Sequence, residues 1–93
     1  MEIEDKYFDL HALSFEDESL LKQASKCGCF YCGEIFSPSE IVEWVPDKNG
    51  KTALCPYCGI DSVIPESSDG EYELNEELLK RMHDVWFSPL KFI

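Results

Sequence analysis

Two copies of one short motif, Cys-x-x-Cys-Gly, stand at positions 29–33 and 55–59 of the 93-residue chain. Thiolates at this spacing suit a tetrahedral metal ion, because the turn brings both sulfurs to one side and directs backbone N–H groups at them. Glycine after the second cysteine avoids the crowding that a Cβ would cause there. Each motif supplies two ligands, so the pair predicts one metal site with four ligands: Cys29, Cys32, Cys55 and Cys58.

A fifth cysteine, Cys27, lies outside both motifs. An odd number of cysteines leaves a disulfide framework incomplete, and metal ligation in a reducing compartment explains the count better. We expect Cys27 to be a free thiol that is buried or close to the site. The alternative is a role in ligand exchange or redox sensing.

The segment between the two motifs predicts a β-hairpin. Residues 41–45 are mostly β-branched or aromatic, and residues 51–54 would return antiparallel after a turn at 47–50. Asn49-Gly50 favours the positive φ values of a type I′ turn. Such a hairpin would bring the second motif back beside the first and close the site.

The N-terminal third predicts one helix. Ser14 followed by Asp17 resembles a capping box, which favours a helix over residues 15–26 that Gly28 ends. Residues 1–12 show no clean period, so we expect them to be flexible or to dock late.

The C-terminal third predicts a second hairpin and a final helix. Residues 62–64 and 71–74 flank a polar loop and would pair as strands. Asn75 is a candidate cap, and the acids that follow it suit the first turn of a helix. Pro89 would end this helix, whose apolar side chains recur at helical spacing: Leu78, Leu79, Met82, Val85 and Trp86.

The tracts Cys29-x-x-Cys32-Gly33-Glu34-Ile35-Phe36 and Cys55-Pro56-x-Cys58-Gly59 resemble the paired knuckles of the zinc-ribbon and rubredoxin-like group. The resemblance covers residues 27–64, and it implies that each knuckle carries two metal ligands. The tract 55–64 and the end Trp86-Phe87 also resemble small bacterial cytoplasmic zinc-binding proteins of unassigned function. We therefore expect one α+β domain over residues 1–93, with a zinc-ribbon-like hairpin core between N- and C-terminal helices.

Four thiolates can hold either zinc or iron. Zinc needs no redox tuning and is the usual ion of structural four-cysteine sites, so we expect Zn²⁺. Iron is the alternative, because rubredoxin-like electron carriers hold it with four cysteines and are also small, acidic and aromatic. The chain differs from them in its shorter segment between the knuckles and in its two helical extensions.

Catalysis is not expected at this site. A closed shell of four thiolates leaves no open position for water or substrate. The two histidines of the chain, His11 and His83, both lie outside the segment between the knuckles, where nucleases built on zinc knuckles would place a catalytic histidine. The sequence therefore favours a protein that is not an enzyme.

The charge of the chain bears on its partners. The formal net charge is -11, and the acids concentrate in residues 1–18 and 66–77. Ribbons that bind nucleic acid need a basic stripe, whereas no basic cluster here exceeds Lys80-Arg81, so no nucleic acid is expected. A protein with a basic surface is a better match, although acids also simply keep a small protein soluble.

These features favour a cytosolic zinc-binding module that binds another protein, with an inhibitor or immunity-type role toward a basic partner as the narrower hypothesis. No apolar run approaches the about 18 residues that span a bilayer, and the acidic N-terminus has no signal-peptide features. Aromatic residues near the C-terminus would either dock a partner or pack against the ribbon. The candidate contact residues are Glu71, Glu73, Glu76, Glu77, Trp86 and Phe87, and the oligomeric state stays open.

Overall fold

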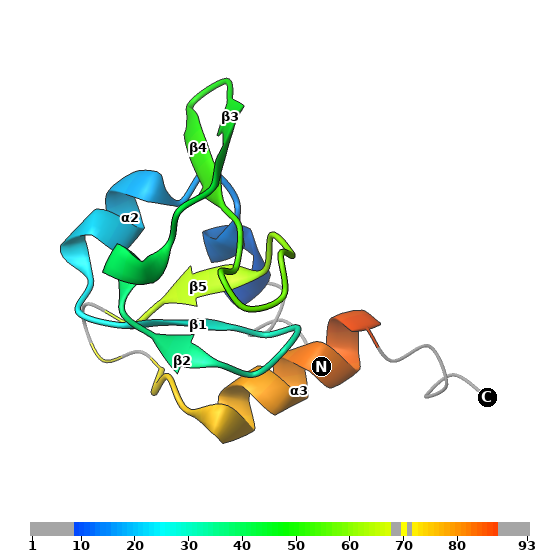
Figure 1. The fold of residues 1–93 in the computed structure, drawn as a ribbon. Coiled ribbons are helices and arrows are strands. Elements are labelled where there is room, and N and C mark those ends of the chain that lie inside the picture. The colour runs from blue at the N-terminus through cyan, green and yellow to red at the C-terminus, as the bar shows by residue number, and fades with distance from the viewer. Residues whose placement is uncertain (1–8, 68–69, 71, 88–93) are drawn as a thin grey trace.

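The computed structural model describes residues 9–67, 70 and 72–87 (Figure 1). The chain combines short helices with antiparallel strands, which confirms the α+β class. The strands are β1 (Cys27–Cys29), β2 (Ile35–Phe36), β3 (Trp44–Asp47), β4 (Gly50–Ala53) and β5 (Val63–Pro65). The helices are α2 (Glu18–Gln23), α3 (Glu76–Phe87) and two 3₁₀ turns, η1 (Ala12–Ser14) and η2 (Pro38–Glu40).

Three strands form an antiparallel sheet in the order β2-β1-β5, and β3 and β4 form a separate hairpin. Cys27 in the central strand pairs with Phe36 on one side and with Pro65 on the other. Figure 1 shows α3 along one face of this sheet, with α2 and the hairpin on the opposite side. The sheet therefore divides the interior into two layers.

Alternation along β1 explains the two layers, because successive side chains of a strand point to opposite faces. Cys27 and Cys29 lie in the cluster that includes Leu21 of α2, whereas Gly28 faces α3. A Cβ on Gly28 would lie 2.9 Å from Cδ1 of Leu79, so the missing side chain lets α3 approach the sheet closely. Gly28 is thus a packing position inside a strand. The sequence had suggested that Gly28 ends a helix, which is wrong.

Each face of the sheet has its own apolar cluster. Full burial of one large apolar side chain stabilises the folded state by roughly 1.5–3 kcal/mol. Leu10 belongs to the cluster beside α3, while residues 1–8 lie outside the described part of the chain. The buried members beside α3 are Leu10, Phe30, Ile64, Leu74, Leu78, Leu79 and Met82. Those on the opposite face are Leu21, Cys27, Cys29, Phe36, Ile41, Ala53, Cys55 and Val63.

The helix predicted over residues 15–26 is wrong in its extent. Glu16 has a φ of 52°, a left-handed conformation that interrupts a helix, and α2 forms only after it. Ser14 does not cap α2, since its Oγ donates to the carbonyl of His11 at 2.7 Å. Asp17 stands at the N-cap, yet its side chain makes no capping bond and faces β4 instead.

The predicted first hairpin is present, with two differences. Its first strand begins at Trp44, because Ile41 instead enters the core directly after η2. Lys48 and Asn49 form the two-residue loop between the paired residues Asp47 and Gly50. Among the described residues other than glycine, only Glu16 has a positive φ, so the turn is not type I′.

The predicted second hairpin is wrong. β5 pairs with β1, so that Ile64 lies opposite Gly28, and residues 72–74 form no strand. Leu74 instead packs into the cluster beside α3. Central β1 thus takes β5 as its second neighbour, and Glu71, which was expected in the returning strand, lies outside the described residues.

The predicted final helix is confirmed as α3. Asn75 Oδ1 accepts a hydrogen bond of 2.9 Å from the N–H of Leu78, which satisfies one donor of the first turn. Glu76 and Glu77 occupy that turn, where negative charge complements the helix dipole. Pro89 lies outside the described residues. Within the described part of the chain, no helix has both the length and the apolarity needed to cross a bilayer.

Candidate metal centre

The two cysteine motifs fold into the same tight turn. The N–H of Gly33 donates to the carbonyl of Cys29 at 2.8 Å, and the N–H of Gly59 donates to the carbonyl of Cys55 at 2.9 Å. The φ angles of these glycines are 84° and 81°, a region that side chains with a Cβ rarely adopt. Glycine is therefore required by the backbone of each turn.

In each turn, the N–H of the first cysteine makes a further hydrogen bond with the residue that follows the turn. The N–H of Cys29 donates to the carbonyl of Glu34 at 3.0 Å, and the N–H of Cys55 donates to the carbonyl of Ile60 at 3.0 Å. The two knuckles are thus equivalent in backbone geometry. They come from different places in the fold, because the first follows β1 and the second lies between β4 and β5.

The four cysteine sulfurs predicted as ligands lie within 4.8 Å of one another. Sγ of Cys29 is 3.6 Å from that of Cys58, and Sγ of Cys32 is 3.7 Å from that of Cys55. Four sulfurs at about 2.3 Å from a tetrahedral zinc would be roughly 3.8 Å apart. The donor set and its spacing therefore fit a four-coordinate metal ion.

Backbone N–H groups point at these sulfurs, as the turn chemistry predicts. Tyr31 donates to Sγ of Cys29 at 3.4 Å, and Tyr57 donates to Sγ of Cys55 at 3.3 Å. The N–H of Cys32 also lies 3.5 Å from Sγ of Cys29. Such bonds stabilise negative charge on sulfur, so they favour the thiolate form that binds metal.

Ser62 provides a contact that the sequence reasoning missed. Its buried Oγ lies 3.1 Å from Sγ of Cys29, and its carbonyl accepts a hydrogen bond of 3.0 Å from the N–H of Phe30. A hydroxyl beside a thiolate acts as the donor. Ser62 therefore ties the segment after the second knuckle to the first. In the sequence, the only indication of this contact was the position of Ser62 four residues after Cys58, and that position suggested a strand.

The four cysteines differ in their exposure to solvent. Cys29 and Cys55 are buried, with 0% and 3% of their surface exposed, and Cys58 is half-buried. Cys32 is exposed. One side of the site is therefore packed against the core, and the side at Cys32 faces solvent.

The acid strength of the thiols follows these surroundings. Burial raises the pKa of Cys58 to about 11 and also raises the pKa of Cys32. For Cys29, burial opposes ionisation, but the hydrogen bonds from Ser62 and from two backbone N–H groups outweigh it and lower the pKa. Metal ions bind cysteine as the thiolate, so metal binding at this site depends on pH.

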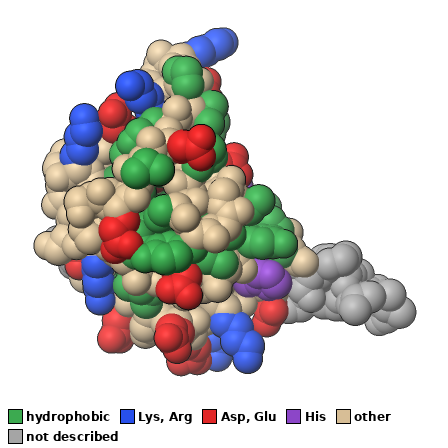
Figure 2. Space-filling model, viewed as in Figure 1, with side chains coloured by type: hydrophobic (Ala, Val, Ile, Leu, Met, Phe, Trp, Pro, Cys, Tyr) green, Lys and Arg blue, Asp and Glu red, His purple; other side chains and the backbone are tan. Residues whose placement is uncertain are grey.

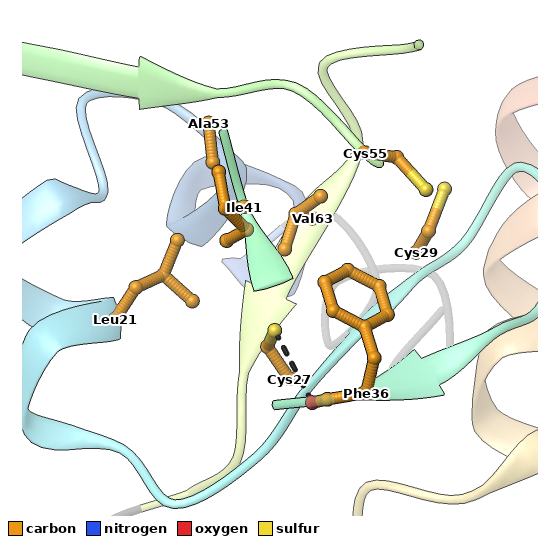
Figure 3. Packing of buried hydrophobic residues seen from close by; sticks show 8 residues of the cluster. All are labelled: Leu21, Cys27, Cys29, Phe36, Ile41, Ala53, Cys55 and Val63. Carbon is orange, nitrogen blue, oxygen red and sulfur yellow. Dashed lines mark hydrogen bonds between the residues drawn. The ribbon is translucent and has the colours of Figure 1, made fainter. Parts of the chain in front are cut away.

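Cys27 does not belong to the cluster. It is fully buried, its Sγ donates to the carbonyl of Phe36 at 3.5 Å, and burial raises its pKa to about 12. Figure 3 shows the sulfurs of Cys29 and Cys55 directed toward one another, with Cys27 apart from them beside Phe36. This agrees with the expected buried free thiol.

The residues considered for partner binding lie in two environments. Glu73, Glu76 and Glu77 are exposed, and Glu77 pairs with Arg81 at 3.0 Å. Trp86 and Phe87 are half-buried and pack against the cluster beside α3. Figure 2 shows acidic side chains interspersed with Lys and Arg on the visible face, without one continuous acidic patch.

The two histidines lie in aromatic surroundings. The ring of His11 lies 3.9 Å from the ring of Trp86, and burial lowers its pKa. The ring of His83 lies between 5 and 6 Å from those of Tyr31 and Phe87. Neither histidine belongs to the cluster of metal-ligand atoms in the described residues.

No family model matches the chain, and searches of curated proteins and of solved structures found no match. Function is therefore inferred from the four sulfurs and their surroundings.

Proposed function

We propose that the protein is a non-catalytic zinc-binding module whose single Zn²⁺ is held by Cys29, Cys32, Cys55 and Cys58. The observation that supports this most strongly is the convergence of four sulfurs within 4.8 Å from two equivalent knuckles. Four thiolates complete a tetrahedral shell, so the ion would have no open position for substrate. The role of the metal is then structural.

The position of the knuckles explains how the metal would stabilise the fold. Cys29 ends a strand of the three-stranded sheet, whereas Cys55 follows the last strand of the hairpin, so one ion joins these two parts. The apparent binding free energy of structural zinc in small domains is about 10–16 kcal/mol near neutral pH. Binding of this strength would make the central fold depend on the metal.

Metal content and colour test this proposal. Protein purified under reducing conditions should be colourless and contain one zinc ion per chain by elemental analysis. Chelation should then lower the midpoint of thermal unfolding, because the unfolded chain does not present the four thiolates together. A chain that purifies without any metal, and takes up none from zinc-supplemented medium, contradicts the proposal.

An iron site is the second candidate, in which the protein would be a rubredoxin-like electron carrier. The exposed position of Cys32 supports it, since an electron carrier needs one edge of its site near the surface. Iron bound to four thiolates gives coloured protein with reversible one-electron reduction. Colourless zinc protein that gains no stable colour on anaerobic iron reconstitution excludes this candidate.

We further propose that the module binds a protein with a basic surface through exposed acids just before and at the start of α3. Glu73 and Glu76 are the relevant described residues, since Glu77 already pairs with Arg81 and Trp86 and Phe87 pack against the core. Electrostatic complementarity of this kind mainly accelerates association. Glu71, another candidate contact residue, lies outside the described residues. An inhibitor or immunity-type role is the narrower form of this proposal.

Matched charge reversals test the acidic surface. The double variant Glu73→Lys/Glu76→Lys should no longer capture a partner protein that the unmodified protein binds in a salt-sensitive manner. The control, Glu43→Lys/Asp47→Lys, changes the net charge equally at exposed acids near and on the hairpin. If both variants capture the partner equally well, the start of α3 is not the contact surface.

A further inference from the structure

We propose that Cys32 is a modification site, the first sulfur of the metal-loaded centre to react with a hydroperoxide, and that Cys55 then forms a disulfide with it and releases the metal. This inference rests on the proposed zinc site. It assigns different roles to cysteines that are equivalent in backbone geometry.

Access distinguishes Cys32 from the other sulfurs. Cys32 is exposed, whereas Cys58 is half-buried and Cys29 and Cys55 expose 0% and 3% of their surface. Cys32 also lines an open cavity of about 390 Å³ between the first knuckle and α3, together with Tyr31 and Lys80. A small peroxide can therefore reach this sulfur without displacing the core.

The hydrogen bonds to sulfur also favour Cys32 over Cys29 as the first sulfur to react. Sγ of Cys29 accepts bonds from the N–H groups of Tyr31 and Cys32, and it also contacts the Oγ of Ser62. These donors draw electron density from the Cys29 sulfur and make it a weaker nucleophile. Among the described residues, no side-chain hydroxyl donates to Cys32, which receives the backbone N–H of Glu34. Oxidation of thiolates follows their nucleophilic character and their exposure.

The reaction balances with the peroxide as the two-electron oxidant. The Cys32 thiolate attacks one peroxide oxygen, an S–O bond forms, the O–O bond breaks, and the second oxygen leaves as hydroxide or alkoxide that takes a proton from water. Sulfur is thereby oxidised to a sulfenic acid. The Cys55 thiolate then attacks this sulfur, an S–S bond forms, and hydroxide leaves. The ion loses two of its four thiolates and dissociates.

The choice of Cys55 rests on distance. Its Sγ lies 3.7 Å from that of Cys32, while a disulfide bond is about 2.05 Å long. A shift of roughly 1.7 Å, shared between the two turns, is enough to bring the sulfurs to bonding distance. The remaining pair, Cys29 and Cys58, is 3.6 Å apart and stays reduced in this first step.

Trypsin provides a direct test, because it separates the two knuckles. Cleavage after Lys26, Lys48, Lys51 and Lys80 places the first knuckle in peptide 27–48 and the second in peptide 52–80. The full chain is purified, its zinc content is measured, and less than one equivalent of hydrogen peroxide is added. A zinc-binding dye follows metal release, N-ethylmaleimide blocks the remaining thiols, and mass spectrometry then locates the first disulfide.

We expect a Cys32–Cys55 link between the two peptides that appears in step with loss of the zinc. The control variant Cys27→Ser should give the same link at the same rate, since Cys27 lies outside the cluster. A first disulfide between any other pair of cysteines, a first sulfenic acid at a cysteine other than Cys32, or zinc retained despite the link, overturns the inference. Protein without zinc before peroxide is added overturns the proposed zinc site instead.

Discussion

Asp17 Oδ1 accepts a hydrogen bond of 3.0 Å from the N–H of Ala53, a residue 36 positions later in the chain. The carboxyl group is fully buried, and among the described residues Oδ2 has no hydrogen-bond partner. This bond fixes the start of α2 against β4, the strand that leads into the second knuckle. A buried carboxyl group with one unsatisfied oxygen is costly when ionised.

The first prediction concerns pH. Burial, opposed by the bond from Ala53, raises the pKa of Asp17 from 3.8 to about 7 in the folded protein. Between these values the folded state holds a proton that the unfolded state has released. The stabilising contribution of Asp17 is therefore complete below about pH 4 and is lost as the pH rises toward 7.

A matched variant isolates this effect from metal binding, which itself depends on pH. Asp17→Asn keeps the acceptor for Ala53 and cannot ionise. Its free energy of unfolding, measured by urea titration with zinc bound, should rise relative to that of the unmodified protein by on the order of 4 kcal/mol between pH 4 and pH 8. A difference between the two proteins that does not change with pH contradicts the assignment.

The second prediction concerns Gly28. Its replacement by alanine would place Cβ 2.9 Å from Cδ1 of the fully buried Leu79, and the overpacking should cost about 1–3 kcal/mol. Leu79→Ala alone should also destabilise the protein, because it leaves a cavity. In the double variant the added methyl group enters that cavity. The measured loss of stability in the double variant should therefore be smaller than the sum of the losses in the two single variants. Additive losses in urea unfolding would show that the two positions do not touch.

The third prediction concerns the cap of α3. Asn75→Ala removes the acceptor for the N–H of Leu78 and should lower stability by about 1 kcal/mol. Asn75→Asp keeps an acceptor and adds negative charge at the helix N-terminus, so it should be at least as stable as the unmodified protein at neutral pH. Thermal unfolding of the two variants compares them directly. Equal destabilisation by both would contradict the capping role.

Local chemistry explains what the sequence could predict. The convergence of sulfurs depends on two turns of five residues and on a hairpin that returns the chain. The turns are visible in residues 29–33 and 55–59, and the hairpin is visible in residues 41–54. The cap at Asn75 and the apolar spacing after it predicted α3 for the same reason. These features are determined by residues close together in sequence.

Contacts between residues far apart in the sequence explain what the sequence could not predict. Ser14 and Asp17 resemble a capping box with Asp in place of Glu, but the Asp17 side chain bonds to Ala53 and the chain bends at Glu16. β5 was expected to pair with the segment after it, yet its partner β1 lies more than 30 residues earlier. Ser62 is important only because folding brings it to Cys29. No local pattern contains these pairings.

Metal content of five single variants tests the central claim most directly. Cys29→Ser, Cys32→Ser, Cys55→Ser and Cys58→Ser should each lose zinc or bind it far more weakly and loosen the central fold, because each removes one of four converging ligands. Cys27→Ser should keep one zinc ion per chain. Equal zinc content and equal stability in all five variants would contradict the four-cysteine site.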